Sequence, residues 1–138
     1  MVARYARELA SGHYRVFLAC LAVMLLHFGD DAFVQEESGS GLGSKLVAAA
    51  VALVLVGVGA AIYPWLGRRV RPVLVALYGL LALGGAWQAH VSNALDDGPA
   101  GGDYTGFLYA LAGLVLLGLA VKLAVELRGR RSAEPARP

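Results

Sequence analysis

The stretch that decides the fold runs from Leu46 to Gly67 and reads LVAAAVALVLVGVGAAIYPWLG, without a charged residue. A helix needs about 20 residues to cross a hydrocarbon core of about 30 Å, so this run alone is long enough. Over the chain of 138 residues, 58% of positions are hydrophobic and 16% are charged. Soluble domains carry about a quarter charged residues, which excludes an ordinary water-soluble globule. We therefore expect an integral membrane protein.

Three further uncharged runs lie at Val16–Gly29, Pro72–Leu95 and Tyr104–Val121. The first is short, but Arg15 can extend its side chain to the headgroups and let a span begin near Tyr14. The sequence thus predicts an all-α membrane protein, a four-transmembrane-helix bundle in a single domain. The expected spans cover about 14–29, 45–66, 72–94 and 104–125, and a basic tail follows over 126–138.

Charge is divided unequally between the two sides of this arrangement. The two tails and the turn after Gly67 hold eleven basic and three acidic residues, a net charge of +8. The two loops on the other side hold one basic and seven acidic residues, a net charge of −6. Because Lys and Arg are retained in the cytoplasm, both termini are expected inside and the acidic loops outside. The expected location is a bacterial cytoplasmic (inner) membrane, crossed several times.

Small residues in the second span predict close helix packing. Lipid is as apolar as leucine, so helices associate in a membrane mainly through close backbone approach. The candidate packing stripe consists of Ala52, Leu53, Val56, Gly57 and Ala60. It serves either packing within one chain or a homodimer face. The single Cys20 lies in the first span and excludes an internal disulfide.

Polar residues gather where the first and third spans reach the outer rim. His27, Asp30 and Asp31 are spaced i, i+3, i+4, which puts them on one face if the helix continues one more turn. A second stripe on the same condition consists of His90, Asn93 and Asp97. Imidazole and carboxylate ligands suit Zn²⁺ or Mn²⁺, so these six residues form a candidate metal or small-ligand site.

Two other interpretations of the rim stay open. A haem could be held between His27 and His90. Alternatively, each histidine makes an ordinary hydrogen bond across the bundle and the acids form a solvated loop that topology keeps outside. The sequence leaves these three readings of the rim unresolved.

Several function classes are excluded or weakened by what the sequence lacks. No P-loop, H-E-x-x-H or dinucleotide fingerprint occurs, and the short basic tail fits topology and anionic lipid better than nucleic acid. A proton-coupled exporter needs a strongly polar group near the midplane, where these spans offer mainly Cys20 and Tyr78. We expect a non-enzymatic accessory or ligand-binding module, with a metal-dependent membrane enzyme as the alternative. Its partners would be the bilayer, another membrane or extracytoplasmic protein, or a second copy.

Two short segments at the outer rim carry a resemblance. GGDYTG at 101–106 and DDAFVQ at 30–35 are similar to segments of small four-helix membrane domains of high-GC bacteria, some of which accompany or precede α/β-hydrolase domains. The sequence has no G-x-S-x-G nucleophile elbow, so the resemblance transfers no catalytic residue. It implies at most a membrane-bound accessory role.

The predicted topology can be tested with single cysteines in a Cys20→Ala background. Cysteines placed at Ser38 and Gly98 should react with an impermeant thiol reagent in intact cells, whereas one at Gly129 should react only after the membrane is opened. Labelling of the Gly129 position in intact cells would contradict the four-span arrangement, because an odd number of crossings separates the two tails.

Overall fold

The computed structural model describes residues 2–34, 41–91, 94–95, 98 and 103–132, and every regular element within them is helical. The expectation of an all-helical fold is thereby confirmed. In chain order the elements are α1 (Val2–Leu9), α2 (Gly12–Phe33), α3 (Leu42–Ile62), the 3-10 turn η1 (Tyr63–Trp65), α4 (Arg71–Ala86), the π-helical segment η2 (Trp87–Val91) and α6 (Asp103–Ser132).

Three helical segments are long and apolar enough to cross a membrane: Gly12–Phe33, Leu42–Trp65 and Tyr104–Arg130. They correspond to the first, second and fourth predicted spans. This agrees with a multi-pass membrane protein.

The third predicted span, 72–94, differs from its expected form. Its α-helical part, α4, has 16 residues, which at about 1.5 Å per residue is shorter than the hydrocarbon core. The chain then widens into a π-helix from Trp87 to Val91. Gly84 and Gly85 directly precede the change, and glycine weakens the preference for an α-helix. Asn93 lies outside the described residues.

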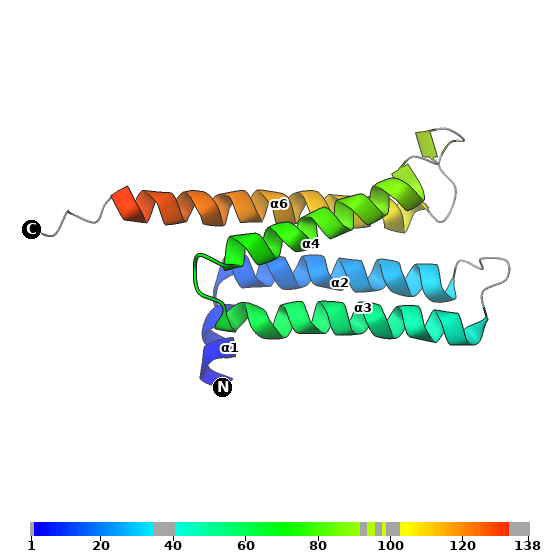
Figure 1. The fold of residues 1–138 in the computed structure, drawn as a ribbon, viewed down its shortest axis with the longest axis horizontal. Coiled ribbons are helices and arrows are strands. Elements are labelled where there is room, and N and C mark those ends of the chain that lie inside the picture. Colours follow the sequence, from blue (N-terminus) through cyan, green and yellow to red (C-terminus); the bar gives the residue numbers. More distant parts are fainter. Residues whose placement is uncertain (1, 35–40, 92–93, 96–97, 99–102, 133–138) are drawn as a thin grey trace, which may run out of the picture.

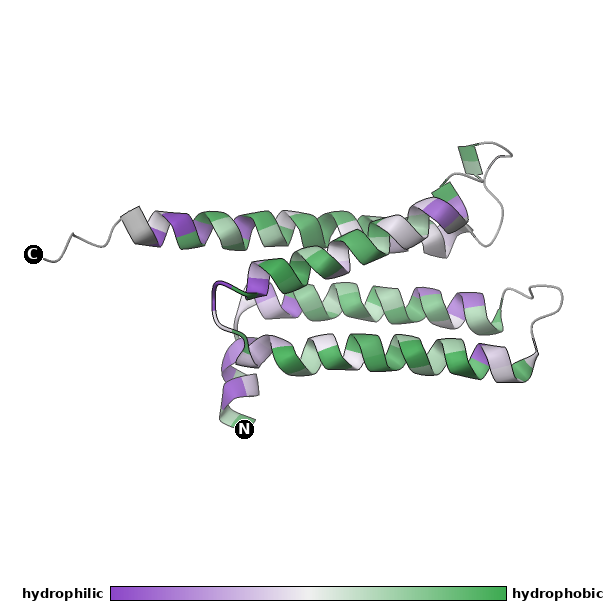
Figure 2. Ribbon diagram, viewed as in Figure 1, coloured by the Kyte–Doolittle hydropathy of each residue, from purple (hydrophilic) through white to green (hydrophobic). Residues whose placement is uncertain are grey.

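The long helices lie side by side and α1 crosses one end of them (Figure 1). Contacts join α3 to α2, α2 to α6 and α6 to α4. Hydrophobic residues dominate the middle of these helices, whereas hydrophilic residues gather toward their two ends (Figure 2). A polar site in this fold is therefore confined to one end or the other.

The backbones of α4 and α6 come close together at two glycines. A Cβ atom at Gly113 would lie 3.0 Å from the carbonyl oxygen of Gly79, and one at Gly79 would lie 3.1 Å from the carbonyl oxygen of Gly113. Most real Cβ atoms stay farther from a backbone oxygen than this, so a larger residue at either position would force the two helices slightly apart. Small residues that allow such an approach are the usual means of helix association in membranes.

Aromatic side chains fill the core between α2, α3 and α4. Phe17 and Tyr63 are fully buried, with ring centroids 5.0 Å apart. The hydroxyl of Tyr14 donates to the carbonyl oxygen of Ala60 at 2.8 Å, and that of Tyr78 donates to the carbonyl oxygen of Leu55. These bonds satisfy polar hydroxyl groups inside an apolar region, where an unmet group is costly.

The predicted packing stripe of α3 is only partly turned inward. Ala52 and Val56 are buried, and Ala60 is half-buried against the core. Gly57 is exposed, and a Cβ there would meet no atom within 4 Å. Within the chain the close contact falls instead at Gly59, where a Cβ would lie 2.5 Å from the Tyr78 hydroxyl. The expected intramolecular role of Gly57 is corrected to Gly59. Leu53 is also exposed.

Helix α1 is fixed to the bundle end by one ion pair and two hydrogen bonds. The Arg71 guanidinium donates to both carboxylate oxygens of Glu8, at 2.9 and 2.7 Å. The Tyr5 hydroxyl donates to the carbonyl oxygen of Ala61 at 2.8 Å and accepts from the Trp65 indole at 3.3 Å. Bidentate pairing of this kind fixes geometry as well as charge.

The α4–α6 crossing can be tested with two glycines of the same helix. Gly113→Ala should lower the free energy of unfolding in detergent by about 1–3 kcal/mol, because the new methyl group overpacks a backbone contact. Gly118→Ala is the matched control, since no atom lies within 4 Å of its Cβ position. It should be neutral or slightly stabilising. Equal stability of the two variants would contradict the crossing.

Candidate metal centre

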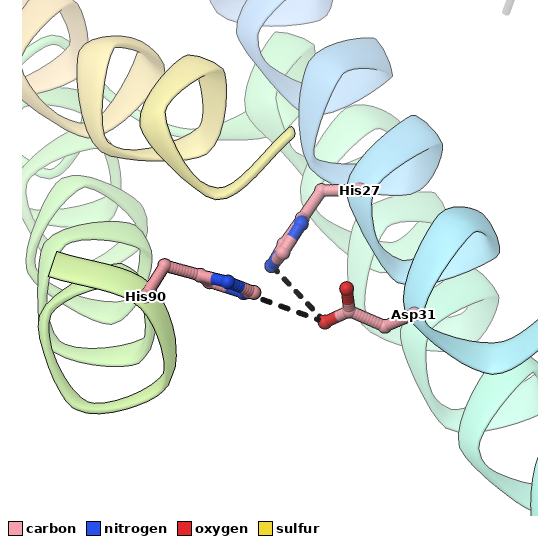
Figure 3. A group of neighbouring side chains, drawn as sticks. All are labelled: His27, Asp31 and His90. Atoms are coloured by element: carbon pink, nitrogen blue, oxygen red, sulfur yellow. Dashed lines mark ion pairs between the residues drawn. The ribbon is translucent and has the colours of Figure 1, made fainter. Parts of the chain in front are cut away.

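Two helices bring three candidate ligands together at one end of the bundle. His27 and Asp31 lie one turn apart near the end of α2, and His90 lies in the π-helical segment η2. His27 Nε2 is 3.3 Å and His90 Nε2 is 3.8 Å from the same Oδ2 atom of Asp31 (Figure 3). The two histidines and one carboxylate each offer a ligand atom, and all three atoms lie within 4.8 Å of one another.

The cluster is buried on the histidine side and open on the carboxylate side. His27 is 3% exposed and His90 is 6% exposed, whereas the Asp31 side chain is 37% exposed. Buried rings hold their ligand atoms in place, and a carboxylate at the boundary gives an ion a path from solvent. The arrangement combines a rigid interior with access from outside.

The last helix supplies the surface against which the two rings pack. Tyr109 stacks on His27 with ring centroids 4.5 Å apart, and the His90 ring meets His27 edge-on at 4.9 Å. The His90 ring occupies the space beside Gly106 where any Cβ would overlap it. Glycine at position 106 is therefore a condition for His90 to reach the cluster.

Asp30 contributes indirectly, through Thr105 of α6. The Thr105 hydroxyl donates to Asp30 Oδ2 at 2.7 Å, and its oxygen lies 3.4 Å from His27 Nδ1. A threonine hydroxyl has one hydrogen, and here Asp30 receives it, so the oxygen is left to accept from Nδ1–H of His27. If Nδ1 donates this long hydrogen bond, a neutral His27 has its free lone pair on Nε2, the atom that lies 3.3 Å from Asp31 Oδ2.

That tautomer puts two electron-rich atoms 3.3 Å apart, the His27 Nε2 lone pair and a carboxylate oxygen. Such a contact is favourable only when a cation stands between the two atoms, either a proton or a metal ion. A second-shell partner on the other ring nitrogen is also the usual companion of a metal-ligating histidine. Electrostatics and hydrogen bonding thus point to the same ring atom.

Two of the three ligand-atom separations approach those around a tetrahedral transition-metal ion, and the limit of 4.8 Å over all three atoms means that the side chains would close slightly around an ion. Bonds of about 2.0–2.1 Å from a tetrahedral Zn²⁺ to nitrogen or oxygen separate neighbouring ligand atoms by about 3.3 Å. The His27–Asp31 pair already has this separation, and the His90 pair at 3.8 Å is close to it. Three protein ligands would leave a fourth position for water or another ligand. The expected Zn²⁺ or Mn²⁺ chemistry fits the residues present.

The haem interpretation does not fit this packing. A haem iron held by two histidines requires their rings on opposite sides of a flat macrocycle. Here one ring meets the other edge-on with ring centroids 4.9 Å apart, too close for an iron to lie between a nitrogen of each ring. The packed rings leave no space for a macrocycle between them.

Of the six residues predicted for the rim, His27, Asp31 and His90 come together and Asp30 lies beside them. Asn93 and Asp97 lie outside the described residues. Thr105, Gly106 and Tyr109 were not predicted as site residues. Two features of the sequence could have indicated them. The last span begins at the same rim, and Thr105 and Tyr109 are spaced i, i+4, which puts them on one face of that helix.

The fold and the site together describe an all-helical protein with membrane-length helices and a histidine–aspartate cluster at one end. Comparisons with protein-family models, with curated proteins and with solved structures each found no match.

The role of Gly106 can be tested by adding a single methyl group. Gly106→Ala should push the His90 ring away from His27, because the new Cβ overlaps the ring. The contact between the two rings, measured as a nuclear Overhauser effect in histidine-labelled protein, should be lost. Gly29→Ala is the control, because Gly29 lies in α2 at the same end of the bundle and no atom lies within 4 Å of its Cβ position. This variant should preserve the contact between the two rings. A preserved contact in Gly106→Ala would refute the assigned position of His90.

Proposed function

We propose that the protein is a multi-pass membrane protein that binds one divalent transition-metal ion, Zn²⁺ or Mn²⁺, through His27, Asp31 and His90. The observation that carries the proposal is the convergence of three ligand atoms, from two helices, within 4.8 Å of one another. The Asp30–Thr105–His27 chain supports it, because it directs the lone pair of His27 toward the shared carboxylate.

The proposed setting is a bacterial cytoplasmic membrane with four crossings and both termini inside. The fourth crossing is supported by contacts at both ends of α4–η2. Arg71 pairs with Glu8 at one bundle end, and His90 reaches Asp31 at the other. The α4–η2 segment thus extends along the same length of the bundle as α2. The division of charge between the two sides of the sequence supports an orientation with the metal site outside and α1 inside.

A non-enzymatic accessory role is the preferred form of this proposal: the module would hold or present an ion at its acidic outer face. Its partners would be the lipids around its exposed apolar side chains, a second membrane or extracytoplasmic protein, or another copy of the chain. If the partner is another copy of the chain, the proposed contact is the lipid-facing side of α3, on which Gly57 is exposed. Small residues on an outward face permit close approach of a second helix.

A metal-dependent enzyme is the second candidate, and the open side of the cluster favours it. Three protein ligands and a fourth open position are the pattern of catalytic zinc sites. The partly exposed Asp31 marks the side from which a water or substrate would enter. Co²⁺ substituted for the native ion distinguishes the two forms: added azide should change the visible spectrum if the fourth position is open and leave it unchanged if the site is closed.

Metal binding can be measured on the purified full chain by loading with Zn²⁺ or Mn²⁺, removing unbound ion and counting what remains. The wild type should retain about one ion per chain, and His27→Ala or His90→Ala should weaken binding by on the order of 100-fold or more. His13→Ala is the matched control, since His13 contacts Glu126 rather than this cluster. It should bind as the wild type does.

Thr105 offers a finer arm of the same experiment. Thr105→Val removes the hydroxyl that bridges Asp30 and His27 and should weaken binding by about 10–100-fold, whereas Thr105→Ser keeps the hydroxyl and should retain most of the affinity. Absence of stoichiometric metal in the wild type, or an equal loss in His13→Ala, would reduce the cluster to a hydrogen-bonded polar contact.

A further inference from the structure

A second candidate site lies at the opposite end of the bundle, where α2, α6 and the start of α4 meet. A cavity of about 160 Å³ opens there between His13, Glu126, Arg68, Arg71 and Arg130. One water molecule occupies about 30 Å³ of the liquid, so the cavity has room for a group of several heavy atoms. It shares no residue with the metal centre.

One ion pair and one histidine–carboxylate contact engage the acidic groups near the cavity. Arg71 is held by both carboxylate oxygens of Glu8 and donates through Nε to the carbonyl oxygen of Leu66 at 3.0 Å. His13 lies 3.4 Å from Glu126. The acidic groups near the cavity are therefore already engaged, and they hold the cavity wall in a fixed shape.

Two further arginines, Arg68 and Arg130, line the cavity. Arg68 comes from the turn before α4 and Arg130 from the end of α6, and within the described part of the chain neither forms an ion pair. Because they come from separate elements, a ligand between them can be contacted from two sides. Arginine forks match the geometry of phosphate oxygens, which makes an anion of this kind the favoured ligand.

The rest of the wall is apolar. Leu123 and Leu127 of α6 line the same cavity, and the membrane-length segment of α6 ends at Arg130. The cavity therefore lies where the apolar part of the bundle gives way to its basic end. A ligand that joins a phosphate to an apolar body would satisfy the arginines and the leucines together. Basic pockets between membrane helices are known to take phospholipid headgroups.

We infer that this cavity binds a phosphate group, and that the leucine wall selects an anionic phospholipid as its source over free phosphate. The headgroup phosphate would lie between Arg68 and Arg130, with Arg71 as the fixed third cation beside it. The glycerol and the upper part of an acyl chain would lie along Leu123 and Leu127. This inference is independent of the metal proposal, because the two sites lie at opposite ends of the bundle.

The test uses the full chain in detergent, with native mass spectrometry to count bound lipid and thermal shift to rank ligands. The probes are phosphatidylglycerol, phosphatidylcholine and inorganic phosphate. Phosphatidylglycerol should bind in preference to phosphatidylcholine, and the double variant Arg68→Gln/Arg130→Gln should weaken its binding by about tenfold or more. Inorganic phosphate should raise the melting temperature less than the lipid does.

Arg69→Gln is the matched control, because Arg69 lies in the same turn, carries the same charge and does not line the cavity. Its affinity for phosphatidylglycerol should stay within about twofold of the wild type. An equal loss in Arg69→Gln and in each of Arg68→Gln and Arg130→Gln would overturn the site in favour of diffuse attraction to basic residues. Binding of phosphate without preference for the lipid would overturn the lipid source, and binding of neither anion would overturn the whole inference. Circular dichroism verifies that each variant is folded.

Discussion

The close crossing of α4 and α6 is the contact on which the rest of the structure depends. Gly79 and Gly113 let the two backbones touch, and this contact fixes the angle and the height at which α4 continues toward the rim. Farther along the same pair of helices, Gly106 leaves the space that the His90 ring occupies. His90, the candidate ligand that follows α4, is therefore positioned by Gly106 and Gly113 of α6. Packing and site chemistry are here one set of contacts.

The apolar middle of the bundle explains why its chemistry is divided between two ends. The Tyr14 and Tyr78 hydroxyls lie among apolar side chains and donate to backbone carbonyl oxygens, which avoids the cost of an unmet polar group. Charged side chains lie instead at the two ends of the bundle, where water is within reach. One end gathers imidazole and carboxylate, which attract cations, and the other gathers guanidinium, which attracts anions. The two candidate sites thus follow from the division of charge that also predicts orientation.

Sequence reasoning predicted the helical class and four spans, of which three have membrane length in the structure, and it paired His27 with Asp31 at i, i+4. Each of these predictions depends on spacing along one helix. It also predicted that His90 would reach the same rim, since alternate spans run in the same direction. It could not predict that Thr105 and Tyr109 would complete the surroundings of His27, because that depends on how α6 is rotated against α2. For the same reason the predicted packing stripe of α3 contained Gly57 and not Gly59. Which side of α3 faces α4 depends on the position of α4, and the sequence of α3 alone does not give it.

The π-helical segment from Trp87 to Val91 places His90 in a turn that holds one residue more than an α turn. Deleting a single residue there would let an ordinary α-helix continue, and the wider turn would disappear without changing how α4 packs on α6. The effect would fall inside the turn itself, on the direction in which His90 leaves the backbone toward Asp31. A one-residue insertion or deletion in this segment is therefore a change at the site and not a change in the packing of the bundle.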